Sequence, residues 1–197
     1  GHNGMVGKSI HKFLLRKKIG KIITIDRKKL NLEDNNKVYK FIKKIKPHVI
    51  INCAGKVGGI IANSTHPTEF LNENILIQGN LIKSAYLCNV EHFINLGSSC
   101  IYPKKSKQPI KEKYLLTGSL EKTNEAYALA KIVGLKMCQF YNEQYKKSYL
   151  TLMPCNLYGP NDNFDLKNSH FIPALIKKII LNKKTKKQSI EIWGNGK

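Results

Sequence analysis

Residues 1–26 of the chain read GHNGMVGKSIHKFLLRKKIGKIITID and predict a glycine-rich turn, a helix and a strand, in that order. Apolar residues recur at helical spacing from Gly4 to about Lys18. Lys21–Asp26 is a short apolar run that predicts a buried strand. Because strands that alternate with helices form parallel sheets joined by helical crossovers, this stretch indicates an α/β fold.

The same alternation continues along the rest of the chain. The patterns predict helices over 38–45, 67–88 and 124–147, strands over 48–53, 91–96 and 148–154, and a last helix and strand between 170 and 193. The expected fold class is α/β, a Rossmann-type doubly wound parallel sheet. We expect an NAD(P)-binding domain over residues 1–165 and the start of a smaller substrate-binding lobe over residues 166–197.

Glycines at positions 1, 4 and 7 form a GxxGxxG turn that opens into the first helix. Such glycines let backbone amides approach a pyrophosphate, which then lies at the positive end of the helix. Asp26 ends the next predicted strand, where an acid would hold a ribose hydroxyl of NAD. The adjacent Arg27 can instead hold the extra phosphate of NADP, so both cofactors remain open. The structural alternative for Asp26 is a helix or turn cap.

Tyr127 and Lys131 lie one helical turn apart in NEAYALAK, so both side chains point from the same face. We expect the lysine to lower the tyrosine pKa from about 10 toward neutrality and so to create a proton donor. Ser98 follows a predicted strand at its carboxyl end, where ligands bind in open sheets, and would orient a substrate toward Tyr127. Tyr-x-x-x-Lys pairs also occur on ordinary helices, and a serine can simply cap a strand end.

The formal charge of +21 raises the alternative of a basic nucleic-acid-binding protein. Arg16 and Arg27 are the only arginines, and the lysines are spread over predicted helix faces. Such a protein would not require Ser98 or the Tyr127/Lys131 pair, and its binding would fall steeply with salt. We therefore expect no nucleic-acid partner. With no apolar run near roughly 20 residues and no signal peptide, we also expect no membrane partner and a cytoplasmic protein.

The five cysteines are odd in number and scattered, without a CxxC pair that would indicate a metal site. We interpret them as free thiols in a reducing compartment, and for most of them a role as small buried apolar side chains suffices. Only Cys100 has neighbours that suggest chemistry.

The glycine turn, the serine at a strand end and YxxxK resemble, in the same order, the extended short-chain dehydrogenase/reductases. Within them the chain is similar to the family of GDP-L-fucose synthases, and LGSSCIYPK and NLYGPNDNF are its most specific segments. The sugar 4,6-dehydratases carry Thr-Asp-Glu where this chain has Ser98-Ser99-Cys100, and the UDP-sugar 4-epimerases lack the cysteine. The similar segments are GHNGMVG, KVGGIIANSTHPTEF, LGSSCIYP, TNEAYALAK, NLYGPNDNF and NSHFIPALI.

The resemblance implies epimerisation of GDP-4-dehydro-6-deoxy-D-mannose at C3 and C5, followed by reduction of the C4 ketone with NADPH. It assigns the reduction to Ser98, Tyr127 and Lys131, and the epimerisation protons to Cys100 and His170. It implies a GDP-sugar as partner, with Lys178 and Trp193 facing it, and we expect a homodimer. The runner-up is another nucleotide-sugar epimerase or reductase of the same superfamily.

The resemblance also implies which residues line the cofactor. Asn3 stands where the family has an arginine, which weakens the preference for NADP over NAD, and Lys178 stands where an arginine often meets the diphosphate. The implied lining residues are Gly1, His2, Asn3, Gly4, Met5, Val6, Gly7, Arg27–Leu32, Leu96, Gly97, Ser98, Ser99, Lys131, Pro154, Cys155, Asn156, Leu157 and His170.

Both ends of the sequence bear on the expected extent of the fold. The chain opens on Gly1 without a preceding strand and stops at Lys197, after a Trp-Gly-Asn-Gly turn. In a dinucleotide-binding sheet the first strand is central, so its loss would leave two neighbouring strands without a partner. We expect a fragment of a longer enzyme that lacks the first strand and the C-terminal part.

Overall fold

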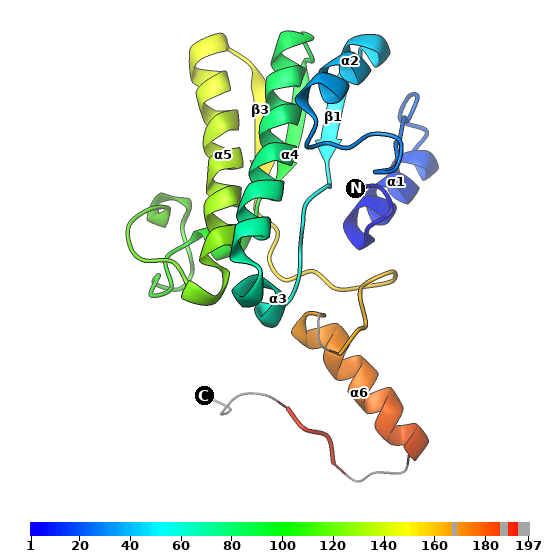
Figure 1. Ribbon diagram of the computed structural model, residues 1–197, viewed down its shortest axis with the longest axis vertical. Coiled ribbons are helices and arrows are strands. Elements are labelled where there is room, and N and C mark those ends of the chain that lie inside the picture. The colour runs from blue at the N-terminus through cyan, green and yellow to red at the C-terminus, as the bar shows by residue number, and fades with distance from the viewer. Residues whose placement is uncertain (167–168, 186–188, 193–197) are drawn as a thin grey trace.

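A computed structural model describes residues 1–166, 169–185 and 189–192 of the chain. Within them, three parallel strands form one sheet in the order β1 (Val49–Asn52), β2 (His92–Leu96) and β3 (Ser148–Leu152). Figure 1 shows helices α2, α4 and α5 in front of this sheet. This α/β arrangement confirms the Rossmann-like fold class. The α-helices are α1 (Met5–Arg16), α2 (Asn35–Ile45), α3 (Ile60–Thr65), α4 (Pro67–Leu87), α5 (Glu125–Tyr145) and α6 (Phe171–Thr185).

Local sequence signals set the helix ends. α2 begins after Asp34, whose carboxylate accepts a hydrogen bond from the Lys37 amide at 3.0 Å. α4 begins with Pro67, whose fixed φ and missing N–H suit a first turn. α2 and α5 both end on a lysine in the left-handed conformation, Lys46 and Lys146. Each of these ends is thus formed by a residue type whose chemistry suits that position.

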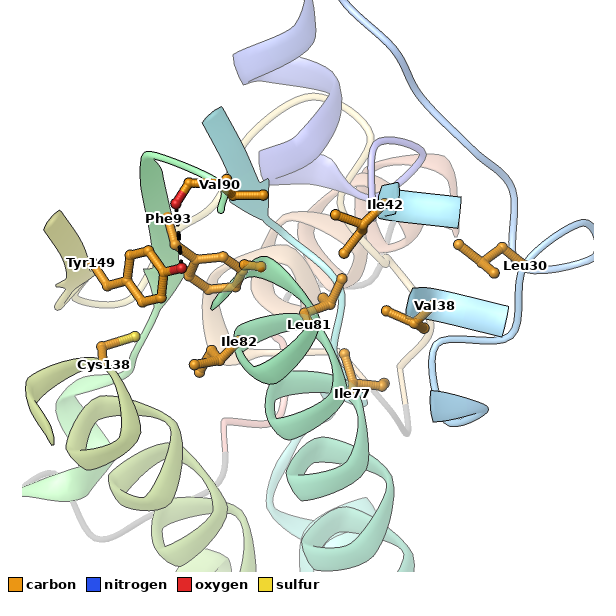
Figure 2. Packing of buried hydrophobic residues seen from close by; sticks show 11 residues of the cluster. Leu30, Val38, Ile42, Ile77, Leu81, Ile82, Val90, Phe93, Cys138 and Tyr149 are labelled. Atoms are coloured by element: carbon orange, nitrogen blue, oxygen red, sulfur yellow. Dashed lines mark hydrogen bonds between the residues drawn. The ribbon is translucent and has the colours of Figure 1, made fainter. Parts of the chain in front are cut away.

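The core lies between the sheet and helices α2, α4 and α5 (Figure 2). Residues of α4 at helical spacing pack against Phe93 of β2 and Tyr149 of β3, so the buried stripe of the helix faces the inward residues of the strands. Burial of this apolar surface is the main stabilising term. The buried cluster comprises Leu30, Val38, Ile42, Ile77, Leu81, Ile82, Ala85, Val90, Phe93, Cys138 and Tyr149.

The end of α5 is tied to the start of β3 by one side-chain amide. Asn142 donates a hydrogen bond to the Tyr149 carbonyl at 2.7 Å and accepts one from the Tyr149 amide at 2.8 Å. The Asn142 side chain therefore satisfies both backbone groups of a residue in β3, as a neighbouring strand would.

The structure differs from the expected elements at three points. The predicted strand Lys21–Asp26 is wrong, because a strand requires a hydrogen-bonded neighbour and this segment pairs with no other described part of the chain. The short helix α3 was not predicted. The predicted last strand is not found over the described residues 189–192, which are irregular. The other predicted helices and strands are confirmed to within a few residues.

Candidate active site

The loop after β2 places Ser98 and Cys100 at the carboxyl end of the sheet. The Gly97 amide donates to the Leu152 carbonyl at 2.8 Å, so the β2 backbone stays attached to β3 up to this point. Ser98 then caps a short 3-10 turn, Ser99–Ile101, and its Oγ accepts from the Cys100 amide at 3.4 Å. Serine is favoured at such a cap because its side-chain oxygen accepts a hydrogen bond from an otherwise free backbone amide. The turn fixes the serine and the cysteine relative to each other.

Helix α5 brings Tyr127 and Lys131 to the same place. The Lys131 Nζ donates to the Leu96 carbonyl at 2.8 Å and lies 5.5 Å from the centre of the Tyr127 ring. The Tyr127 hydroxyl is hydrogen-bonded to Ser98. The structure therefore gathers four of the five predicted catalytic residues, Ser98, Cys100, Tyr127 and Lys131, at the end of β2.

Burial controls the protonation of this cluster. It raises the pKa of Tyr127 to about 12, with a further increase from the Cys100 thiol that the hydrogen bond from Ser98 only partly offsets. It also lowers the pKa of Lys131 to about 8, against an opposing effect of Cys53. The expected lowering of the tyrosine pKa toward neutrality is therefore wrong, because desolvation of the phenol is the dominant effect. At neutral pH the phenol is protonated and able to donate.

Two side chains that sequence reasoning missed support the cluster. The Asn124 Nδ2 lies 3.3 Å from the Cys100 Sγ and holds the thiol at the start of α5. The Phe70 ring of α4 packs edge-on against Tyr127, with 6.3 Å between ring centres. Both contacts join segments that are far apart in the sequence. No local spacing signal could have found them.

The glycine turn meets the geometric demands of a phosphate loop. A Cβ atom on Gly1 would lie 2.1 Å from the Cys53 carbonyl oxygen, and one on Gly7 would lie 2.1 Å from the Gly1 oxygen. Only glycine allows the turn to pack this closely against the residue that follows β1. Gly4 then precedes α1, so the first amides of that helix point into the turn. Met5 and Val6 form the first turn of α1.

The segment after the turn presents an acid and an arginine. Asp26 accepts from the Asn3 Nδ2 at 2.6 Å, and the His2 ring lies 3.5 Å from the same carboxylate. The Arg27 guanidinium is three-quarters exposed and lies 3.0 Å from Glu33 and 3.5 Å from Glu73. His2, Asn3 and Arg27 thus surround one patch next to the glycine turn.

Glu73 also connects this patch to the loop after β1. The sequence did not predict this connection. The second Glu73 oxygen accepts from the Lys56 Nζ, at 2.5 Å. The Lys56 backbone is in turn held by Asn74, which accepts from its amide and donates to its carbonyl, both at 3.0 Å. α4 therefore fixes the loop after β1 by two consecutive side chains.

Of the remaining predicted residues, His170 and Lys178 belong to the α6 region, apart from the cluster. His170 is exposed and precedes α6, where its carbonyl accepts from the Ala174 amide at 3.1 Å. Figure 1 shows α6 away from α5, beyond the carboxyl end of the sheet. The Lys178 Nζ donates to the Glu191 carbonyl at 2.7 Å. Pro154, Cys155, Asn156 and Leu157 follow β3 in an irregular stretch. Trp193 lies outside the described residues.

Known proteins resemble this chain over its whole length. Residues 1–197 match the NAD dependent epimerase/dehydratase family. The chain is 48% identical over 196 residues to GDP-L-fucose synthase of Sinorhizobium fredii, covering 100% of this chain and 62% of that protein. It is 46% identical over 197 residues to GDP-L-colitose synthase of Yersinia pseudotuberculosis, covering 100% of this chain and 64% of that protein.

A solved structure agrees with these relatives. A GDP-L-fucose synthetase from Naegleria fowleri bound to NADP matches with a TM-score of 0.88 and 28% identity, covering 100% of this chain and 64% of that one. The chain thus spans less than two thirds of the length of the proteins that it matches. Among the described helices, none combines the length and the apolar character that crossing a membrane requires. On the family match and these relatives, the chain belongs to the NAD dependent epimerase/dehydratase family.

Proposed function

We propose that this chain forms the cofactor-binding and catalytic half of a GDP-L-fucose synthase. The enzyme would epimerise GDP-4-dehydro-6-deoxy-D-mannose at C3 and C5 and then reduce its C4 ketone to give GDP-L-fucose. One observation carries the proposal: Ser98, Cys100, Tyr127 and Lys131 meet at the carboxyl end of β2. Their proximity supports a site in which a proton donor and a thiol would act on one substrate.

In the reduction, Tyr127 gives its proton to the oxygen at C4. Ser98 hydrogen-bonds the tyrosine hydroxyl and orients the ketone toward it. The Lys131 ammonium, 5.5 Å from the ring centre, stabilises the negative charge that develops on the phenol oxygen. The protonated state of Tyr127 at neutral pH suits this donor role.

In the epimerisation, Cys100 removes a proton from the carbon next to the ketone and His170 returns one to the opposite face. A thiol and an imidazole are both side chains that can take up and release protons in general acid–base catalysis. Cys100 is held by Asn124 within the cluster. His170 would reach the substrate from the start of α6.

The residues of the glycine turn fit a dinucleotide. Gly1 and Gly7 leave no room for a side chain, so backbone amides can approach a pyrophosphate at the start of α1. Arg27 would meet the additional phosphate of NADP, which the solved relative from N. fowleri carries. The groups that would hold the cofactor further are Leu96–Ser99, Lys131 and 154–157. When bound, NADPH supplies the hydride that reaches C4.

The proposal includes further partners. Lys178 and Trp193 would face the GDP-sugar from the second lobe, which begins near residue 166. Apolar side chains exposed on α4 and α5, among them Leu76, Leu129 and Phe140, are suited to pair with a second copy in a homodimer. We place the enzyme in the cytoplasm, where its free cysteines stay reduced.

A second candidate is a reductase or epimerase for a different GDP-sugar. The similarity to GDP-L-colitose synthase of Y. pseudotuberculosis, at 46% identity, favours this alternative nearly as strongly as the similarity to the fucose enzyme. Under this alternative the same cluster would act on a different GDP-sugar.

The deciding experiment is turnover by the full-length enzyme with purified keto-sugars. We expect NADPH oxidation with GDP-4-dehydro-6-deoxy-D-mannose, together with deuterium incorporation at C3 and C5 in heavy water. Turnover of only a 3,6-dideoxy keto-sugar would favour the colitose alternative. Absence of turnover with every GDP-keto-sugar, by a folded enzyme that binds NADPH, would refute the proposed function.

A further inference from the structure

A row of buried side-chain amides runs beneath the catalytic cluster from β1 to α5. The Ala54 amide donates to Asn52 at 3.0 Å, Asn52 donates to Asn95 at 3.1 Å, and Asn95 donates to the Gln78 Oε1 at 3.0 Å. Asn52 and Asn95 are partners in the ladder between β1 and β2. Asn95 is fully buried and Gln78 is 1% exposed. Buried amides persist only when they are hydrogen-bonded, and each of these is.

The row ends on the backbone of the catalytic helix. The Gln78 Nε2 donates to the Ala130 carbonyl of α5 at 3.1 Å and to the Asn74 carbonyl of its own helix at 2.9 Å. Ala130 directly precedes Lys131. Gln78 is therefore bonded both to β2, through Asn95, and to α5, at the residue beside the catalytic lysine.

The lysine itself spans the same two elements. Its Nζ donates to the carbonyl of Leu96, the residue after Asn95. The Lys131 backbone thus lies next to Ala130, which Gln78 contacts on α5. Its ammonium bonds the residue next to Asn95, which Gln78 contacts on β2. The glutamine fixes the distance between the backbone of the lysine and the oxygen that its ammonium must reach.

Gly134 provides the space for this arrangement. A Cβ atom at Gly134 would lie 2.2 Å from the Gln78 Oε1 and 2.9 Å from the Asn95 Nδ2. Glycine is unfavourable inside a helix, and here it lies in the middle of α5, so a packing reason is required. The buried amides supply that reason.

We propose that Gln78 is a positioning residue for the reduction, one that sets where Lys131, and with it Tyr127, stands relative to the end of β2. This inference rests on the proposed function, in which Lys131 and Tyr127 serve ketone reduction. Gln78 touches neither substrate nor cofactor in this role. It acts through the Ala130 carbonyl and Asn95.

The test uses the full-length enzyme with Gln78→Met, which keeps the length of the side chain and removes both of its hydrogen-bonding groups. Because misplacing a catalytic group by about 1 Å lowers rates roughly 10²-fold, we expect kcat for reduction to fall by about 10-fold to 100-fold. The KM for NADPH should change less than about threefold, since the glycine turn is untouched.

A second readout follows the lysine directly. In protein that carries ¹⁵N-labelled lysine, the Lys131 ammonium should titrate with a pKa near 8 in the wild type. In Gln78→Met its pKa should be higher, because a displaced ammonium regains contact with solvent. Lys131→Met identifies the signal. This titration needs no substrate, so it decides the inference even if the enzyme turns over no GDP-keto-sugar and the proposed function fails.

Two glycine variants complete the design. Gly134→Ala should reproduce both effects, and adding it to Gln78→Met should cause little further loss, because both act on one contact. If Gln78→Met does not fold, Gly134→Ala carries the test, since it removes no hydrogen-bonding group. Gly79→Ala on α4 is the matched control, because its added Cβ would meet only the Met137 sulfur, at 4.0 Å. Wild-type kcat and Lys131 titration in folded Gln78→Met or Gly134→Ala would overturn the inference.

Discussion

The start of α5 and the start of α6 both carry predicted catalytic residues, but they present them in different ways. On α5, Lys131 is buried and Tyr127 is partly buried, and they are hydrogen-bonded to the Leu96 carbonyl and to Ser98, respectively. His170, before α6, is exposed and stands apart from them. The groups proposed for the reduction are thus already assembled, whereas those proposed for the epimerisation are assembled only in part.

This difference separates chemistry held by the packed sheet from chemistry that, in our proposal, also needs the region of α6. Burial fixes geometry and shifts protonation, since it raises the pKa of Tyr127 and lowers the pKa of Lys131. An exposed histidine gains neither effect until another surface covers it. The predictions below test the two halves independently.

The largest effect should come from Tyr127→Phe. Removing the hydroxyl takes away the proposed proton donor and leaves the ring packed against Phe70, so the fold and NADPH binding should persist. Ketone reduction should fall by roughly 10²–10⁴-fold, measured as NADPH oxidation with the keto-sugar present. Deuterium exchange at C3 and C5 should continue. Near-normal oxidation would show that the donor lies elsewhere.

The next effect concerns Cys100→Ser and His170→Ala in heavy water. Each should slow deuterium incorporation at C3 or C5 by about 10²-fold, because a proton-transfer group is lost. NADPH binding should be unchanged. Cys88→Ser is the matched control, since that thiol lies near α2, far from the cluster. Wild-type exchange in both variants would mean that the pair is structural and that only the α5 half is catalytic.

Lys131→Met should reveal the energetic consequence of burying the lysine. Its folded pKa of about 8 lies below its ordinary value, so between about pH 8 and 10.5 the unfolded chain binds a proton that the folded chain does not. Stability should therefore rise with pH across this window, by an amount on the order of 3 kcal/mol, and be constant below it. Urea unfolding of wild type and Lys131→Met measures the difference.

In that comparison the free energy of unfolding of Lys131→Met should lack this rise. The exposed Lys40 provides the control, because Lys40→Met should follow the wild-type pH dependence. Parallel curves for wild type and Lys131→Met would contradict the burial effect.

The smallest effect should come from Arg27→Ala, in the exposed patch. Wild type should bind NADPH more tightly than NADH, and the variant should lose about 10-fold of this preference, since an exposed arginine contributes at the low end of charged hydrogen bonds. The Arg27 guanidinium already forms ion pairs with Glu33 and Glu73. Fluorescence titration with both cofactors measures the ratio, with Arg16→Ala as control. Equal binding of NADH by wild type would disprove the preference.

Local patterns predicted most of the fold because they report local physics. The helical spacing around Tyr127 and the apolar run before Ser98 each depend on nearby residues, and the structure places both as expected. The predicted strand Lys21–Asp26 is wrong because a strand forms only by hydrogen bonding to a neighbouring strand, and the sequence of one segment does not report its neighbour.

The support of the site was less predictable than its reactive groups. The spacing of Tyr127 and Lys131 was sufficient to place them on one face. Gln78, Asn124 and Glu73 carry no such signal, because each acts through a partner at least 17 residues away. Their roles emerge only when α4, α5 and the strand ends are packed together. The raised pKa of Tyr127 likewise depends on burial, which spacing does not report.

The double hydrogen bond of Asn142 has a consequence for association between molecules. A strand at the border of a sheet offers free amides and carbonyls to any passing strand, a common route to aggregation. Within the described sheet β3 is such a border, and Asn142 occupies both backbone groups of Tyr149 there. A foreign strand can pair at this position only by displacing a side chain of the same chain. Asn142 thereby protects the start of β3 from pairing with strands of other molecules.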